Sequence, residues 1–190
     1  MEICESGMVF SFREGILAVK YDDCPFYRKR YNAIDGGKGM DILASEQSAI
    51  YFIEVKNCED TAENQDKWRR QYSGTRNMNT LASEIAGKVA HTCACLAGAA
   101  TYGERSKDAE TLLECINALD FCKTASFEKT LFVLLFLEGD FSCKTRPNEA
   151  IYSDLRQRIE RRLKWLNCRV DVVSTKTHRL SAFEVTLQHG

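Results

Sequence analysis

The chain alternates short apolar runs with polar breaks, and the spacing of its apolar positions predicts both strands and helices. Residues 7–21 carry two short apolar runs, as expected of one or two strands at the start of a sheet. Residues 40–44 and 49–56 are predicted to form two further strands, joined by a turn at 46–48. The second of these strands is apolar on both faces, which is typical of a buried central strand.

The second half of the chain predicts helices that alternate with strands. Residues 81–100 are rich in Ala and lack Pro, which favours a buried helix, and a second helix is expected over 108–119. Residues 130–137 form a continuous apolar run, as in another central strand, and 169–174 predict a closing strand. Between these two strands a helix is predicted in which an apolar residue recurs every four positions, at Ile151, Leu155, Ile159 and Leu163.

Two segments lack a regular pattern. Residues 35–39 contain three glycines and predict a loop just before the strand at 40–44. Residues 59–79 have almost no aliphatic side chains, and we expect them to form a mobile segment on the substrate side of the molecule. The order of the elements predicts an α/β fold over 1–190, as one domain: an α/β/α sandwich with a central mixed sheet.

Composition narrows the class of protein and its location. A chain of 190 residues with 44% hydrophobic residues can fill a core, and its formal net charge of -1 means that any nucleic-acid surface is a local patch. The nine cysteines are scattered and odd in number, which favours free thiols in a reducing compartment. Without a basic leader or an apolar run of about 18 residues, the chain is expected to be cytoplasmic, with no membrane contact.

The predicted hairpin brings charged side chains together. If its turn is symmetric about Gln47 and Ser48, Asp41 falls opposite Glu54. Facing residues have Cβ atoms about 5 Å apart, and like charges there destabilise the sheet, so a positive group should lie between them. Lys56 follows two residues after Glu54 and points to the same face. A divalent cation would complete the neutralisation, and Mg²⁺ suits a site of one or two carboxylates with waters and a substrate phosphate.

Within residues 39–57, the order of Asp41, twelve intervening residues and Glu54-Val-Lys resembles the PD-(D/E)XK nuclease superfamily. The resemblance implies a restriction-endonuclease-like fold with an α/β/α core. It also implies that Asp41 and Glu54 bind Mg²⁺, with Mn²⁺ as a substitute, joined by the backbone carbonyl of Val55. Lys56 would then position or activate the attacking water.

The chain departs from the family pattern at three points. Met40 stands where the motif has the Pro that names it. Members often take a further acidic residue from a preceding helix, for which Glu2, Glu5 and Glu14 are the candidates here. The Gln-x-x-x-Tyr element of one branch of the family is not cleanly present, because Gln65 and Gln71 have no Tyr at the right offset, so the subfamily stays open.

Basic and aromatic residues on both sides of the hairpin predict contacts with nucleic-acid phosphates and bases. The candidate residues are Arg28, Lys29, Arg30, Lys38, Trp68 and Arg69. An exposed charged loop explains residues 27–31 equally well, and a local core contact is the alternative for Trp68. The arginines of the last helix are expected to form a solvated face.

A zinc cluster of His91, Cys93 and Cys95 is disfavoured, because the spacing contains no paired Cys-x-x-Cys and only His91 and Cys95 would share a helix face. Buried small thiols explain the cysteines better.

These observations predict a metal-dependent deoxyribonuclease that hydrolyses phosphodiester bonds, with DNA favoured over RNA, in restriction, repair or defence. The alternative is a catalytically inactive nuclease-fold protein that binds nucleic acid or a protein partner within a larger complex. The intact set of Asp41, Glu54 and Lys56 favours the enzyme, because a relaxed site would be expected to lose carboxylates that repel each other. Strandedness, endo or exo cutting, and a homodimer or other protein partner stay open.

Overall fold

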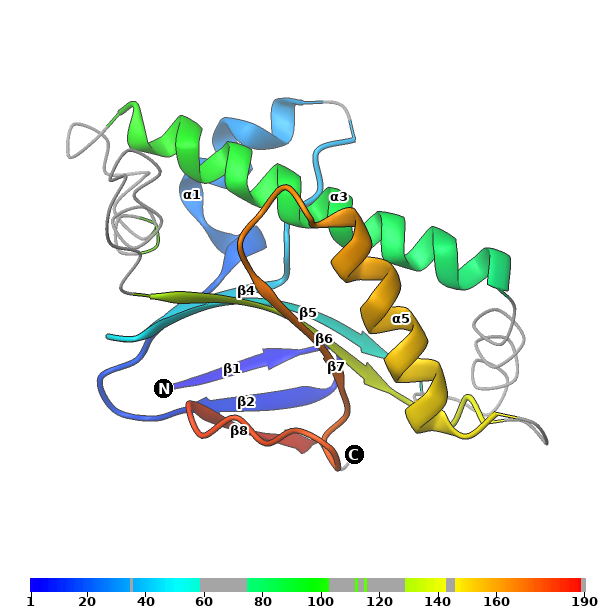
Figure 1. The fold of residues 1–190 in the computed structure, drawn as a ribbon. Helices are drawn as coiled ribbons and strands as arrows, with labels where there is room; N and C mark the ends of the chain where they lie inside the picture. The colour runs from blue at the N-terminus through cyan, green and yellow to red at the C-terminus, as the bar shows by residue number, and fades with distance from the viewer. Residues whose placement is uncertain are drawn as a thin grey trace.

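A five-stranded mixed sheet forms the middle of three layers, between two long helices and a smaller sheet (Figure 1). The computed structural model describes residues 1–34, 36–58, 75–102, 112, 115, 129–142 and 146–188. The strands are β1 (Glu2–Glu5), β2 (Met8–Phe12), β3 (Leu17–Lys20), β4 (Ile42–Ser45), β5 (Ala49–Asn57), β6 (Thr130–Glu138), β7 (Arg169–Val173) and β8 (Phe183–Leu187). The helices are α1 (Pro25–Lys29), α3 (Thr75–Ala100) and α5 (Asn148–Arg162), with 3₁₀ turns η1 (Tyr21–Asp23) and η2 (Tyr31–Ala33).

The central sheet has the strand order β3-β4-β5-β6-β7. β3, β4 and β5 pair antiparallel, whereas β5, β6 and β7 pair parallel. β5 and β6 are apolar on both faces because a layer covers each side of the sheet. The mixed α/β class expected from the sequence is confirmed.

The register of the β4–β5 hairpin is also as predicted. Leu43 lies opposite Phe52, as the symmetric turn requires. Period-2 alternation explains this agreement, because a slip of one residue would turn every buried side chain to the opposite face.

The paired residues end at Ile42 opposite Ile53, and the Asp41 N–H donates to the carbonyl of the same Ile53 at 3.0 Å, so Asp41 lies one step off this register. The predicted pairing of Asp41 with Glu54 is therefore not part of the ladder, but the Asp41 carboxylate accepts a hydrogen bond from the Val55 N–H and so lies beside Glu54.

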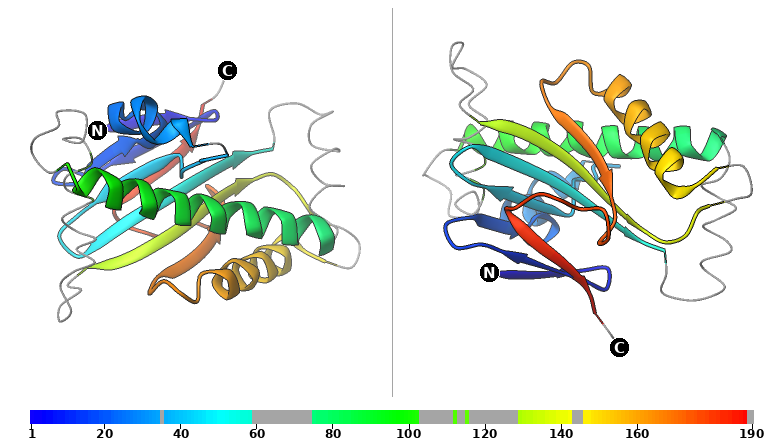
Figure 2. Two further views of the ribbon diagram at one scale, coloured as in Figure 1. Left: turned by 90° about the horizontal axis from the view of Figure 1, so that it is seen from above. Right: turned by 60° about the horizontal axis from the view of Figure 1, so that its bottom comes forward.

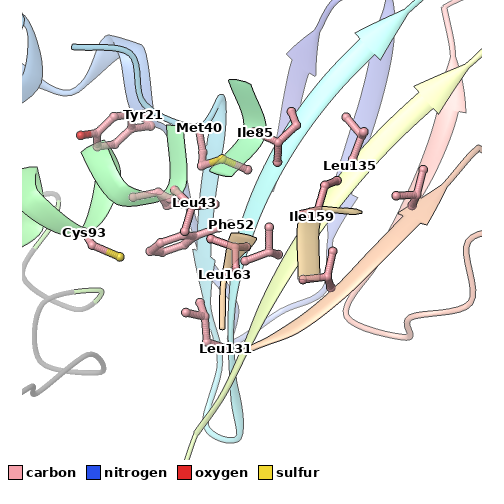
Figure 3. Close-up of a cluster of buried hydrophobic side chains, with 14 of the residues drawn as sticks. Tyr21, Met40, Leu43, Phe52, Ile85, Cys93, Leu131, Leu135, Ile159 and Leu163 are labelled. Atoms are coloured by element: carbon pink, nitrogen blue, oxygen red, sulfur yellow. The ribbon is translucent and has the colours of Figure 1, made fainter. Parts of the chain in front are cut away.

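α3 and α5 lie side by side over one face of the central sheet (Figure 2). The predicted stripe of α5 is buried along its length, at Ile151, Leu155, Ile159 and Leu163. Figure 3 shows Ile159 and Leu163 in one cluster of buried side chains with Leu43 and Phe52 of the hairpin and Ile85 of α3. The helical layer thus covers the face to which the even-numbered residues of β5 point.

The opposite face is covered by the sheet β1-β2-β8, where the α/β/α expectation places helices. The Phe10 ring meets the Phe136 ring edge-on at 5.1 Å, so the two sheets share a core. β1 and β8 were not predicted from the sequence. Both are short and partly exposed, and only their pairing with β2 makes them strands.

The structure moves the start of the helix predicted over 81–100, and with it the end of the segment predicted to be mobile. α3 begins at Thr75, so the expectation of a mobile segment over 59–79 is wrong for residues 75–79, where packing on the sheet extends the helix. Residues 59–74, and the helix predicted over 108–119 apart from 112 and 115, lie outside the described residues. None of the helices described here combines the length and the apolar character needed to cross a bilayer.

Candidate active site

Asp41, Glu54 and Lys56 converge beneath α3. The even-numbered residues of β5 face this helix, whereas Ile53 and Val55 are buried against the second sheet. The Lys56 Nζ lies 3.1 Å from the Glu54 Oε1. The Val55 N–H donates to the Asp41 Oδ2 at 2.8 Å, which holds the carboxylate at the edge of β5.

α3 contributes two further charged side chains to this site. The Lys88 Nζ donates to the Glu54 Oε1 at 2.6 Å and lies 3.4 Å from the Asp41 Oδ1. The Glu84 Oε1 accepts from the Lys56 Nζ at 3.1 Å. Positions four apart on a helix lie on one face, so α3 presents both side chains to the hairpin. We call these five residues the charged cluster.

Burial dominates the electrostatics of Glu54. Its side chain has no exposed surface, and this burial, followed by the Asp41 carboxylate, raises the pKa of Glu54 to about 7 against the lowering effect of Lys88 and Lys56. For Lys56, burial lowers the pKa, but the Glu54 and Glu84 carboxylates raise it more, so the pKa lies above its ordinary value. The cluster therefore combines a carboxyl that is costly to ionise with a firmly charged lysine.

The donor set of the cluster fits a hard divalent cation. The Glu54 Oε2 is buried and has no hydrogen-bond partner among the described residues, so this acceptor oxygen is available to a cation. The Asp41 carboxylate is near enough to raise the pKa of Glu54, and carboxylate oxygens are ligands that Mg²⁺ prefers. Within the described part of the chain, no group of three or more His, Cys, Asp or Glu side chains could hold a metal. Protein ligands beyond two carboxylates would thus come from the backbone, with water completing the set.

The three acidic residues considered for a further ligand have other surroundings. Glu2 accepts a hydrogen bond from the Ser11 hydroxyl at 3.1 Å, and Glu5 forms an ion pair with Lys20 at 2.9 Å. Glu14 is exposed. Glu84 of α3 is the additional carboxylate that the fold brings to the cluster.

The predicted nucleic-acid contacts divide into several groups. Arg28 forms an ion pair with Asp23 and donates to the Asp22 carbonyl, and the Arg30 guanidinium lies 4.6 Å from the centre of the Tyr102 ring. These two arginines have partners within the protein. The two lysines among the predicted nucleic-acid contacts, Lys29 and Lys38, are exposed. The other two candidates, Trp68 and Arg69, lie outside the described residues.

His91, Cys93 and Cys95 contact different neighbours in the structure. The thiols of both cysteines are buried, and the His91 Nδ1 is hydrogen-bonded to the Tyr31 hydroxyl at 3.0 Å. Burial raises the pKa of Cys93 to about 12 and that of Cys95 to about 11, so both stay protonated near neutral pH. The interpretation of these cysteines as small buried hydrophobes is confirmed.

Sequence reasoning missed Glu84 and Lys88. A signal was present, because the two residues stand four apart in a helix otherwise rich in Ala and apolar residues. However, the pattern of α3 does not reveal which strand its charged face meets. That pairing depends on how the helix packs across the sheet.

The fold and the site define a mixed α/β protein with a buried cluster of acidic and basic side chains between a hairpin and a helix. The chain belongs to a family of unknown function (DUF6661), whose model matches residues 24–186. All five residues of the charged cluster fall within the match. Neither the curated proteins nor the solved structures contain a match to the chain.

Proposed function

We propose that this protein is a Mg²⁺-dependent nuclease of the PD-(D/E)XK superfamily, with a restriction-endonuclease-like fold, that hydrolyses phosphodiester bonds of DNA. The observation that carries the proposal is the convergence of Asp41, Glu54 and Lys56 on one face of the hairpin, with the buried Glu54 Oε2 left without a partner among the described residues. A purely structural ion pair would be expected to satisfy both oxygens of a buried carboxylate.

Each residue of the hairpin has a role that its position supports. Asp41 and Glu54, with the Val55 carbonyl, would hold the metal, and the Val55 N–H fixes the orientation of the Asp41 carboxylate. When bound, Mg²⁺ would supply an activated water and neutralise charge on the phosphate oxygens. Lys56, held by Glu54 and Glu84, would orient the attacking water and stabilise the negative charge that develops on the phosphate.

Nucleic acid would reach the cluster through a local basic surface. The formal net charge of -1 offers no general attraction for DNA, so exposed lysines such as Lys29 and Lys38 would supply the phosphate contacts. Double- and single-stranded DNA are the first substrates to test, and RNA is the second. A role in restriction, repair or defence in the cytoplasm is consistent with such an activity.

The test is cleavage of labelled single- and double-stranded DNA and RNA with Mg²⁺, with Mn²⁺ or with EDTA. The wild-type protein should cut DNA only with a divalent metal, and Glu54→Ala and Lys56→Ala should lower the rate by at least about a hundredfold. Lys129→Ala is a matched control, because Lys129 bonds to the Ser45 hydroxyl at the turn end of the hairpin. Equal cutting by the cluster variants would refute the assignment.

A second function is favoured by one observation. Lys88 already places a positive charge between the two carboxylates, so the cluster can persist without a metal or catalysis. The protein would then be an inactive nuclease-fold subunit that binds nucleic acid or a protein partner. Metal-independent DNA binding by the wild-type protein, without cleavage in any metal, would favour this function.

A further inference from the structure

We propose that Lys88 is a built-in competitor for the metal: its ammonium group holds the cation position between Asp41 and Glu54, and a divalent ion binds there by displacing it. This inference rests on the proposed function, because it concerns the same carboxylates. It adds a specific role for a residue of α3 that lies outside the hairpin motif.

The geometry places the ammonium where a shared metal would be bound. The Lys88 Nζ is 2.6 Å from the Glu54 Oε1 and 3.4 Å from the Asp41 Oδ1, so one cation already bridges the two carboxylates. Only 11% of the Lys88 side chain is exposed, so the charge is enclosed with its partners. Mg²⁺ needs oxygen ligands at about 2.0–2.1 Å. An ion bound by both carboxylates and an ammonium at this distance would repel each other strongly.

α3 also supplies a place for the displaced ammonium group. Glu84 lies one turn before Lys88 on the same face, in the Glu-to-Lys spacing that favours an ion pair on a helix. The Glu84 side chain is 41% exposed, so this carboxylate leads from the cluster towards solvent. A change of side-chain rotamer can therefore free the carboxylates without moving the helix.

The charges of the cluster explain what this exchange would achieve. Its three carboxylates and two ammonium groups carry a net charge of -1 when all are ionised. Adding a divalent ion changes this to +1, which suits a phosphodiester with a single negative charge. Before the metal binds, Lys88 compensates two carboxylates that would otherwise repel each other. Lys88 thus stabilises the metal-free fold and lowers the affinity for the metal.

The direct test is calorimetric titration of Mn²⁺ into the wild-type protein and into Lys88→Met, which keeps a long side chain but removes the charge. Lys88→Met should bind Mn²⁺ at least about tenfold more tightly. Lys129→Met is the matched control and should bind as the wild type does. The double variant Lys88→Met/Glu54→Gln should lose the gain, because the binding requires the Glu54 carboxylate.

The outcomes separate this inference from the proposed function. An unchanged or weaker affinity of Lys88→Met, together with metal-dependent cleavage by the wild type, would overturn the competitor role and leave the nuclease assignment intact. Absence of Mn²⁺ binding by both proteins would overturn both proposals.

A second measurement uses the wild-type protein and does not depend on the folding of a variant. Reductive methylation, followed by mass spectrometry, reports how accessible each lysine amine is. Saturating Mg²⁺ should increase the labelling of Lys88 several-fold relative to exposed Lys38. Equal labelling of Lys88 with and without the metal would contradict displacement.

Discussion

Glu54 shows most clearly how this site depends on its surroundings. A fully buried carboxylate is costly unless charges compensate it, and here Lys56 and Lys88 approach the same oxygen, Oε1. The other oxygen has no partner among the described residues. Burial, followed by the Asp41 carboxylate, raises the pKa of Glu54 to about 7, where metal binding and protonation compete for the same carboxylate.

The raised pKa of Glu54 predicts a pH-dependent stability of the metal-free protein. The pKa rises from 4.5 to about 7 on folding, so the folded state binds the proton more tightly. The stabilising contribution is complete below the unfolded pKa and is lost as pH rises through the folded pKa. We expect the free energy of unfolding to fall by up to about 3 kcal/mol between about pH 5 and pH 8, measured by urea denaturation in EDTA.

Glu54→Gln should remove this part of the pH dependence. The exposed Glu184 provides the control, because Glu184→Gln should keep the wild-type profile. The comparison uses the change with pH within each protein, since the loss of a partner for Lys88 can alter the absolute stability of Glu54→Gln. A profile of Glu54→Gln that parallels the wild type would contradict the assignment.

The buried cysteines give a second prediction for individual residues. Burial raises the pKa of Cys93 and Cys95 well above neutrality, so neither forms the reactive thiolate. Iodoacetamide at about pH 8 should label exposed Cys4 in the native protein and leave both buried cysteines unmodified, as read by mass spectrometry. Labelling in urea is the control, and rapid native labelling of Cys93 would show that α3 opens from the sheet.

Among the elements, the segment before β4 has a close steric fit. A Cβ atom at Gly39 would lie 1.9 Å from a ring atom of Tyr21, and the Tyr21 N–H donates to the Asp41 carbonyl at 2.8 Å. Tyr21 is fully buried and packs against Tyr27. The glycine is therefore required because the Tyr21 ring occupies the space beside it, and the backbone N–H of the same tyrosine holds the Asp41 carbonyl.

Gly39→Ala should lower the free energy of unfolding by about 2 kcal/mol or more, because the buried Tyr21 ring cannot move without disturbing its neighbours. Gly87→Ala is the matched control: Gly87 lies within α3 with open space around its Cβ position, and the change should stabilise the protein by about 0.5–1 kcal/mol. Denaturant unfolding measures both. Equal effects of the two substitutions would mean that the Tyr21 ring moves aside for the added methyl group at little cost in stability.

At the scale of the whole molecule, two cores on opposite faces of one sheet hold the hairpin in place. The core under the helices contains Phe52, whereas the core under the second sheet contains Ile53 and Val55, so β5 is anchored from both sides. Phe183 of β8 closes the second core and meets Tyr51 edge-on at 5.8 Å. The second sheet therefore supports the strand that carries Glu54.

Phe183→Ala should destabilise the protein by about 3–5 kcal/mol, because it leaves a cavity between the two sheets. Leu17→Ala, at a side chain that is 48% exposed, should change the stability by less than about 0.5 kcal/mol. Thermal and urea denaturation test both variants. A small effect of Phe183→Ala would mean that the second sheet contributes little to the fold.

Local sequence patterns were sufficient to predict which residues of the hairpin and of α5 share a face. Alternation along β4 and β5 predicted that Leu43 would lie opposite Phe52 and that Lys56 would share a face with Glu54, and the four-residue stripe predicted the buried side of α5. These features have short-range periods, so neighbouring residues alone determine them. The roles of these residues in metal binding and catalysis stay predictions.

Only the tertiary structure decided which distant segments meet. The pairing of β8 with β2 and the packing of α3 over the hairpin join residues far apart in the sequence, and no local period records such contacts. The sequence could therefore indicate that a positive group belongs between Asp41 and Glu54, but not that Lys88 supplies it. By itself the sequence determined the faces of the elements, whereas the packing of those faces determined the charged cluster.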